Sequence, residues 1–459
     1  MARRRRRDGM DERHPLCFRC KCERARAVVR QREALCASCL EEVLHLRFKS
    51  QLRRDPRLDS RTKNRPSKRT SKEASAEERT TKLAMACSGG IASSAMLRML
   101  AHVQSREQGR AERGRIAFAM EAYVVDESCL ADEQDEGTTK QFAARVAEEA
   151  VNIVEESRKT QADAESRAGR GEFLDFRAHV LPLEDVFDET SNGTERRRRC
   201  RELVLGVRDE TGREDLIAHL RMQRLRAAAE SGSVDLLLLG ECATRMAVRA
   251  IAETVKGKGY AMPGNIQLAD NRLGKDRPTV LRPLRDSVAK ELAFYCHFAG
   301  LRLHEKPWRV VQGTTLNGLS DEFVATLQAN LPSSVSTVFR TVEKIQAFPF
   351  NEEWEELNTE FQSFCTIEPA KAPTLCTLCL APLSKRELNA KDQIGQMNKL
   401  DGPVLCRSCL VQIVGTDTTV VANLPQSMRH RSHGCAQDKS QRNEAARAYI
   451  AEYLLDEEE

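Results

Sequence analysis

The sequence predicts an α/β protein, in which a parallel-sheet domain has a cysteine-rich module on either side. Three observations predict this class. Short apolar strands alternate with amphipathic helices between Thr81 and Gly300, which is the pattern of an open parallel sheet joined by crossover helices. Paired Cys-x-x-Cys motifs precede and follow that region. A Ser-Gly-Gly tripeptide stands at its first strand-to-helix junction.

Composition and charge bound the organisation of the chain. Its 459 residues fit one large domain with smaller modules. The net charge is only +5, but basic residues concentrate at Arg3 to Arg7 and in 50–80. We interpret 1–14 as a disordered basic arm and 50–80 as a flexible basic linker. Such segments are either solvated tails or arms that attract phosphate.

Targeting and membrane signals are missing from the sequence. No stretch approaches the ~20 apolar residues that span a bilayer, and no apolar segment follows the N-terminal arginines as in a secretory signal. We therefore expect a cytoplasmic protein with no membrane association. In a reducing compartment, the 16 cysteines indicate metal or sulfur chemistry rather than disulfides.

The N-terminal cysteines have the spacing of a structural zinc site. Fifteen residues separate two Cys-x-x-Cys knuckles, and four thiolates in this pattern hold Zn²⁺ tetrahedrally. We expect 15–49 to form a zinc ribbon whose folding depends on the metal. Cys22 offers a spare thiol, so the choice between Cys20 and Cys22 stays open. The predicted ligands are Cys17, Cys20, Cys36 and Cys39.

A second cysteine set lies near the C-terminus. Twenty-six residues separate its knuckles, and each knuckle has the form Cys-x-x-Cys-Leu. We expect 368–459 to contain a second zinc ribbon followed by a charged tail; reduced surface cysteines are the alternative. The predicted ligands are Cys376, Cys379, Cys406 and Cys409. The remaining cysteines, Cys87, Cys129, Cys200, Cys242, Cys296, Cys365 and Cys435, are scattered.

The elements between these modules follow from hydrophobic periodicity. The predicted strands are Lys82–Cys87, Ile116–Val125, Phe176–Leu183, Val234–Leu239 and Thr279–Leu284. The predicted helices are Ser93–Glu107, Lys140–Ser157, Glu214–Ser231, Thr244–Val255 and Ser287–Gly300. Polar loops are expected over Glu189–Arg201 and Gly257–Asn271. Because Leu301–Ile367 has a largely helical pattern, we expect 81–367 to be one α/β domain with a helical extension.

The Ser-Gly-Gly turn is typical of a loop that holds phosphate. Its glycines let the backbone turn sharply and approach an anion closely, and amides at the start of the following helix would point at that anion. The alternative is a tight turn before an N-capped helix. The candidate phosphate-binding residues are Ser88, Gly89, Gly90, Ser93 and Ser94.

A family resemblance makes the phosphate-binding hypothesis for this loop more specific. "CSGGIASS" is similar to the SGGxDS signature of the PP-loop ATP pyrophosphatase superfamily. The segments 213–263 and 280–301, together with both cysteine modules, resemble the cytoplasmic tRNA 2-thiolation proteins. Among these, the sequence most resembles the members that partner the catalytic thiolase subunit. The resemblance implies a Rossmann-like PP-loop domain (adenine nucleotide alpha hydrolase-like) flanked by N-terminal and C-terminal zinc ribbons.

The resemblance also implies a function. Such proteins are required for 2-thiolation of the wobble uridine, as 5-methoxycarbonylmethyl-2-thiouridine, in cytosolic tRNAs for Lys, Glu and Gln. The catalytic subunit of the heterodimer activates the uridine with ATP, and sulfur comes from a thiocarboxylated ubiquitin-like carrier. If the functional residues of the superfamily are transferred to the matching positions of this sequence, the Ser-Gly-Gly loop would bind pyrophosphate. Gly240 would approach the nucleotide, and Arg282 would be a basic residue near it.

Three departures from the catalytic pattern point to a supporting subunit. Ala92 stands where the signature has Asp. Cys200 stands alone among arginines where catalytic subunits carry Cys-x-x-Cys, and 301–310 holds no later cysteine, so we expect no iron–sulfur cluster. Cys200 is expected to be either an exposed thiol or a reactive one. The surrounding arginines are candidate tRNA contacts or part of a disordered insertion: Arg196, Arg197, Arg198, Arg199 and Arg201.

Three hypotheses stay open from the sequence. The first is a tRNA-binding, non-catalytic subunit of a tRNA thiolase heterodimer. The second is an ATP-dependent tRNA sulfurtransferase that acts alone. The third is a zinc-ribbon interaction protein with a vestigial nucleotide fold. We favour the first, and the sequence leaves ATP binding open.

Overall fold

The computed structural model describes residues 16–29, 33–58, 81–108, 118–132, 134–164, 176–188, 192–274, 277–306, 315–344, 375–383, 404–415 and 419–429. Several predictions lie outside these ranges. They are the basic arm 1–14, most of the linker 50–80, the helical pattern beyond residue 344 and the charged tail, together with Cys365 and Cys435.

A six-stranded sheet forms the centre of the protein. Its strand order is β5-β4-β3-β6-β8-β7, and every neighbouring pair is parallel except β7 with β8. This order confirms the predicted α/β class with a parallel sheet. The strands are β3 (Thr81–Ala86), β4 (Phe118–Asp126), β5 (Arg177–Pro182), β6 (Leu236–Leu239), β7 (Ala269–Asp270) and β8 (Thr279–Leu281).

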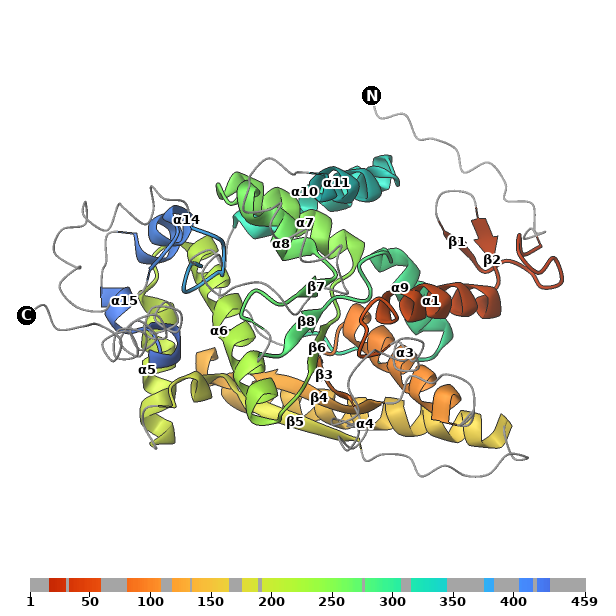
Figure 1. Cartoon of the computed structure of the whole chain (residues 1–459), viewed down its shortest axis with the longest axis horizontal. Coiled ribbons are helices and arrows are strands. Elements are labelled where there is room, and N and C mark those ends of the chain that lie inside the picture. Colours follow the sequence, from red (N-terminus) through yellow and green to blue (C-terminus); the bar gives the residue numbers. More distant parts are fainter. Residues whose placement is uncertain are drawn as a thin grey trace, which may run out of the picture.

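Helices cover both faces of the sheet (Figure 1). Alternate residues of a strand point to opposite faces, so Leu83 and Met85 pack in one core and Ala84 in another. On the first face lie α3 (Ile91–Gln108), α4 (Glu136–Ala164) and α9 (Ala289–Phe298). On the second lies α6 (Glu210–Ser231).

Two predicted loops are wrong. The arginine-rich segment forms helix α5 (Gly193–Gly206), capped by the Asn192 side chain, which accepts hydrogen bonds from the next amides. One narrow apolar stripe, Cys200, Leu203 and Val204, holds α5 to the core. The segment 257–271 contains short elements rather than a loop, namely η3 (Gly259–Ala261), α8 (Met262–Ile266) and β7.

The helical extension packs beside the sheet. Helix α7 (Ala243–Val255) contacts α10 (Leu316–Asn330) and α11 (Ser334–Glu343). The helical prediction for Leu301–Ile367 is confirmed in these two helices. Short 3₁₀ turns, η1 (Ser128–Leu130) and η2 (Leu183–Val186), follow β4 and β5.

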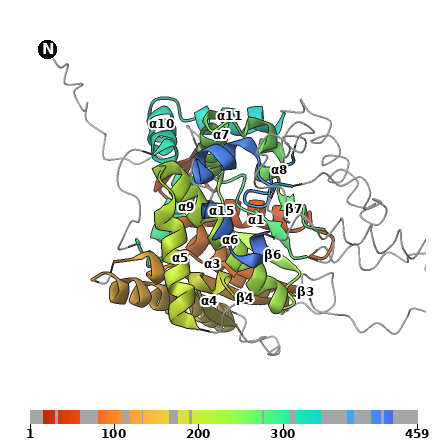
Figure 2. The ribbon, with the colours of Figure 1, turned by 90° about the vertical axis from the view of Figure 1, so that its left-hand side faces the viewer.

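The two cysteine modules lie at opposite ends of the long axis (Figure 1). The N-terminal four-cysteine module comprises β1 (Ala27–Val29), β2 (Glu33–Leu35) and α1 (Ala37–Leu52). The C-terminal four-cysteine module comprises α14 (Arg407–Cys409), the π-helical turn η6 (Leu410–Val414), α15 (Thr419–Ala422) and α16 (Gln426–Arg429), together with the knuckle at 375–383. Seen from that end, this module stands in front of α6 (Figure 2).

Helix α1 fastens the N-terminal module to the sheet domain. Its buried face, which includes Leu44 and Phe48, joins the core that contains α3 and α9. Arg47 donates hydrogen bonds to both oxygens of the Glu291 carboxylate at 3.0 Å. Within the described residues, no helix combines the length and apolar character needed to cross a membrane.

Candidate functional site

The N-terminal cysteines converge as predicted. The sulfur atoms of Cys17, Cys20, Cys36 and Cys39 all lie within 4.8 Å of one another, and Cys20 Sγ lies 3.9 Å from Cys36 Sγ. Zn–S bonds of about 2.3 Å in a tetrahedron require S···S distances of about 3.8 Å. The exposed Cys22 is outside the set and donates to the Cys20 carbonyl. The open choice between Cys20 and Cys22 is therefore resolved in favour of Cys20.

Backbone amides favour the thiolate form of Cys17. Burial alone would raise the pKa of Cys17, but amides of Cys20, Cys36 and Arg19 lower it to about 6. Hydrogen bonds to the charged form of a group lower its pKa in this way. Burial instead raises the pKa of Cys36 and of Cys39.

The C-terminal cysteines also converge, despite the longer segment between their knuckles. The sulfurs of Cys376, Cys379, Cys406 and Cys409 lie within 4.8 Å of one another, and Cys379 Sγ is 3.6 Å from Cys406 Sγ. Four thiols at these distances fit a tetrahedral Zn²⁺. The leucine after the first knuckle, Leu380, is buried and has a φ of 59°.

The Ser-Gly-Gly loop satisfies its own polar groups. The hydroxyls of Ser88 and Ser93 are 3.2 Å apart, and Ser93 donates to the Gly90 carbonyl at 3.0 Å. Both Ser93 and Ser94 are buried. The loop begins α3 as predicted, but the hydroxyls of Ser88 and Ser93 are engaged within the turn itself.

A remote segment covers the loop. The His304 amide donates to the Gly89 carbonyl at 2.9 Å. A Cβ at Gly89 would lie 2.8 Å from Val146 Cγ2 and 3.0 Å from His304 Cβ. The cavity left beside the loop has a volume of about 10 Å³, which suffices for about one water molecule. A cavity of this size is too small for a triphosphate.

Gly240 has a packing role. An added Cβ would lie 3.0 Å from the Ser93 nitrogen and 3.1 Å from the Ala92 carbonyl carbon. The end of β6 therefore approaches the first turn of α3 directly. The resemblance implied that this glycine approaches a nucleotide, and the structure places it against protein backbone.

Replacing Gly240 with alanine should lower the free energy of unfolding by about 1–3 kcal/mol, because the added methyl overpacks rigid backbone. Urea unfolding would measure the change. Gly206→Ala is the matched control, since an added Cβ there meets nothing within 4 Å. Equal stability of the two variants would contradict the packing role.

A larger cavity lies at the carboxyl ends of β4, β6 and β8. Its volume is about 650 Å³, and ion pairs dominate its wall. Glu241 pairs with both Arg249 and Arg282. Asp270 pairs with Arg226 at 3.6 Å and with Arg272 at 2.8 Å. Arg282, predicted to lie near a nucleotide, is therefore buried in this network.

These carboxylates are held in their charged form. Burial raises their pKa, but paired cations outweigh it: Arg249 and Arg282 lower the pKa of Glu241 to about 2. Arg221 and Lys306 do the same for the pKa of Glu127, also to about 2. The sequence interpretation missed both glutamates. Each follows a predicted strand closely, where side chains of a parallel sheet gather.

The arginines of α5 are engaged within the protein. On the exposed face of α5, Arg198 donates hydrogen bonds to the carboxylates of Glu195 and Glu202. The remaining contacts are Arg196 with Asp185, Arg197 with Glu136, Arg199 over the ring of Phe187 and Arg201 with Asp132. The alternative of a disordered insertion is thus wrong, because the segment is an ordered helix with largely compensated charge.

The structure decides against one of the two alternatives given for Cys200. It is fully buried, so it is not an exposed thiol. Its sulfur lies 3.7 Å from that of Cys129, a buried residue of η1. The contact with Cys200, together with burial, raises the pKa of Cys129. The pair packs α5 against the end of β4.

The strand order, the Ser-Gly-Gly turn after β3 and the two flanking four-cysteine modules define a PP-loop-like α/β protein. A sequence profile described as "Cytoplasmic tRNA 2-thiolation protein 2" matches residues 315–448. The chain is similar to the cytoplasmic tRNA 2-thiolation protein 2 family.

Individual relatives carry the same description. The rice protein (Oryza sativa subsp. japonica) is 32% identical over 292 residues, and the match covers 61% of each chain. The zebrafish protein (Danio rerio) is 21% identical, and the match covers 96% of this chain and 95% of the relative. The chain thus spans 61% of the length of the rice relative.

A solved structure resembles the chain more distantly. It is "U34-tRNA thiolase NcsA from Methanococcus maripaludis with its [4Fe-4S] cluster", which is 14% identical, with a TM-score of 0.45. That match covers 72% of this chain and 88% of the thiolase.

Proposed function

We propose that this protein is the supporting, tRNA-binding subunit of a cytoplasmic tRNA thiolase heterodimer. The complex would 2-thiolate the wobble uridine of cytosolic tRNAs for Lys, Glu and Gln, with sulfur from a thiocarboxylated ubiquitin-like carrier. Similarity to the cytoplasmic tRNA 2-thiolation protein 2 family supports the pathway. The covered loop supports the division of labour: His304 and Val146 fill the space over Gly89.

The chemistry of uridine activation explains why the covered Ser-Gly-Gly loop bears on the division of labour between the two subunits. Adenylating a uridine requires ATP with its phosphates against loop amides and an acceptor oxygen held nearby. Here Ala92 offers no carboxylate, and Lys306 and Arg221 both pair with Glu127 at the carboxyl end of β4. We assign ATP binding to the partner subunit. Zinc at the two four-cysteine modules would stabilise folding.

Contacts with tRNA would come from basic surfaces. Arg198 is half exposed on α5, and the basic segments 1–14 and 50–80 would add long-range attraction to phosphate. Because four of the five candidate arginines of α5 are paired with acids, each of these four would contribute less than a free cation. They remain candidates, and the other two hypotheses remain alternatives.

Purified heterodimer and isolated chain separate the hypotheses. The isolated chain should form no AMP with ATP and tRNA, whereas the heterodimer should. Ser88→Ala in this chain should leave heterodimer activity within about two-fold, because no transition-state contact is lost. The equivalent loop substitution in the partner is the positive control.

Robust AMP formation by the isolated chain would favour an autonomous enzyme. If deleting the chain left tRNA 2-thiolation intact, the interaction-protein hypothesis would stand instead.

A further inference from the structure

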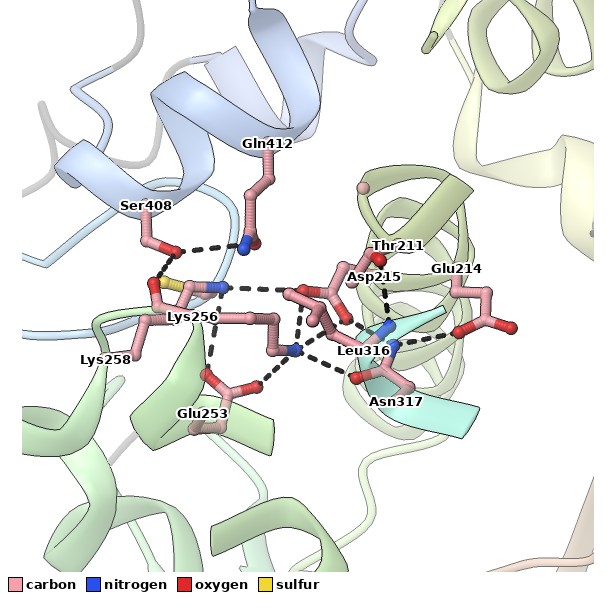
Figure 3. Close-up of polar contacts among 12 residues, drawn as sticks. Thr211, Glu214, Asp215, Glu253, Lys256, Lys258, Leu316, Asn317, Ser408 and Gln412 are labelled. Atoms are coloured by element: carbon pink, nitrogen blue, oxygen red, sulfur yellow. Dashed lines mark hydrogen bonds and ion pairs between the residues drawn. The ribbon is translucent and has the colours of Figure 1, made fainter. Parts of the chain in front are cut away.

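Two basic regions of the protein use their cations internally. Beside the C-terminal four-cysteine module, Lys256 Nζ lies 2.8 Å from Asp215 and 2.9 Å from Glu253 (Figure 3). Lys258 Nζ is 3.7 and 3.8 Å from the same two carboxylates. On α5, four of the five candidate arginines pair with acids. A polyanion that bound in either region would compete with these internal pairs.

The N-terminal four-cysteine module presents cations that have no acidic partner. The side chains of Lys21, Arg24 and Arg26 are exposed. In the part of the chain that the structure describes, no acid pairs with any of these three. The neighbouring Arg19 contacts Glu42 at 3.3 Å, and such an exposed pair is weak. This end of the molecule therefore carries positive charge that is available to a binding partner.

Apolar side chains are exposed on the same module. Phe18 is 69% exposed, more than any other large apolar side chain that the structure describes. Leu16 and Val28 are 58% and 50% exposed. Single exposed apolar residues need no explanation, but several of them beside available cations indicate a contact surface.

One extended segment carries both kinds of side chain on its outer side. Burial alternates residue by residue over 24–29, so Arg24, Arg26 and Val28 are exposed whereas 25, 27 and 29 are buried. Alternate residues of a strand point to the same face and lie about 7 Å apart. The three exposed side chains therefore form a row along β1 and the residues that lead into it.

Two more exposed residues border this row. Leu16 pairs with Arg24 in an antiparallel bridge. The Phe18 amide donates to the Ala34 carbonyl at 2.8 Å, and Ala34 pairs with Val28 between β1 and β2. The resulting surface is called the ribbon face, and it consists of Leu16, Phe18, Arg24, Arg26 and Val28.

An aromatic ring among available arginines has the chemistry of a surface for unpaired RNA. Bases stack on exposed aromatic rings, and basic side chains neutralise the adjoining phosphates. The spacing of about 7 Å along the row suits neighbouring phosphates of one extended strand. The run Arg3 to Arg7 precedes this face in the chain and would attract the same polyanion over a longer range. Figure 1 shows β1 and β2 at the outer end of the module, away from the sheet domain.

We propose that the ribbon face binds a segment of tRNA that has unpaired bases. Phe18 stacks on a base, and Arg24 and Arg26 bind the phosphates beside it. Because Phe18 stands between Cys17 and Cys20, a closed metal site would hold its ring in place. This inference rests on the proposed function, since it names the surface through which a tRNA-binding subunit contacts its RNA.

Fluorescence anisotropy with a labelled, unmodified tRNA transcript for Lys tests the proposal on the full-length chain. Phe18→Ala should weaken binding about 5–150-fold, the usual effect of losing one stacked base, and should leave the salt dependence unchanged. Arg24→Gln and Arg26→Gln together should reduce the slope of log affinity against log salt by about 1.4, because each phosphate contact to a single strand contributes about 0.7. Phe18→Trp keeps an aromatic ring and should bind like the wild type.

Two matched controls come from the rest of the surface. Phe323 is an aromatic residue of α10 with 53% exposure, and Phe323→Ala should bind tRNA like the wild type. Arg198 is an exposed arginine compensated by two acids, and Arg198→Gln should change the salt slope less than the ribbon-face pair does. All variants should keep the zinc content of the wild type. If Phe18→Ala loses metal, the arginine pair carries the test.

The outcomes separate this proposal from the proposed function. Wild-type affinity and salt slope in both ribbon-face variants would overturn the proposal, while tRNA binding by the unmodified chain would still support a tRNA-binding subunit. If neither the wild-type chain nor its heterodimer binds tRNA, the proposed function fails and this inference fails with it. Normal tRNA binding by variants that no longer co-purify with the catalytic subunit would make the ribbon face a protein interface and overturn the RNA assignment.

Discussion

Replacing Cys406 with serine should remove one of two bound metal ions and unfold the C-terminal four-cysteine module. Cys406 is fully buried, and its sulfur lies beside those of the other three ligands. Metal contributes about 10–16 kcal/mol to the folding of small zinc modules at neutral pH, so little of this module should persist without it. Elemental analysis and limited proteolysis would measure both effects.

The Cys406→Ser substitution should also disturb the wall of the large cavity. The knuckle that lines it is held through Leu380 by Arg272, so unfolding of the module removes this contact from the cavity wall. Cys22→Ser is the matched control, because that thiol is exposed and outside both sets. A Cys406→Ser protein that retained two metals and a protected C-terminal module would contradict this assignment.

Replacing Glu241 with glutamine should destabilise the sheet domain by about 3–5 kcal/mol near pH 7, the usual cost of removing one member of a buried ion pair. The substitution leaves Arg249 and the buried Arg282 without this shared carboxylate. Urea unfolding of the metal-loaded protein would measure the loss.

The stability lost in the Glu241→Gln protein should decrease as the pH falls. Paired arginines lower the pKa of Glu241 from 4.5 to about 2. A lowered pKa adds stability that is fully present above the unfolded value and disappears as the pH falls through the folded one. The difference between wild type and Glu241→Gln should therefore shrink from about pH 4.5 toward pH 2. Acid also releases metal from both proteins, so the difference between them is the quantity to follow.

Glu202→Gln is the matched control. This exposed carboxylate pairs with Arg198 on α5, and surface pairs contribute about 0–1 kcal/mol. Glu241→Gln destabilisation within that range, or an unchanged difference in acid, would refute the proposed role of Glu241 as a shared counter-charge.

Local patterns in the sequence predicted most of the sheet domain. Leu236 to Leu239 form a continuous apolar run, which is typical of a parallel strand buried on both faces. Helix α5 was missed because only three buried side chains, set among arginines, hold it to the core. The helical periodicity of its apolar residues is weak, and its high content of charged residues suggested a loop.

The cysteine sets could be found because spacing alone defines them. The covering of the phosphate loop could not, since His304 meets Gly89 from more than 200 residues away. The hydrogen bond between Ser408 and Lys256 could not be predicted either, because these residues are 152 positions apart in the sequence. Such contacts depend on the tertiary arrangement, and no local periodicity reports them.

The attachment of α1 to α9 has a consequence for synthesis on the ribosome. Arg47 and Glu291 are 244 residues apart, so the N-terminal module emerges long before its binding surface exists. At about 5–20 residues per second, the wait is on the order of 10–50 seconds. During that time the apolar side chains of α1, including Leu44 and Phe48, have no sheet domain to cover them. Nascent chains are therefore expected to depend on chaperones until α9 has been made.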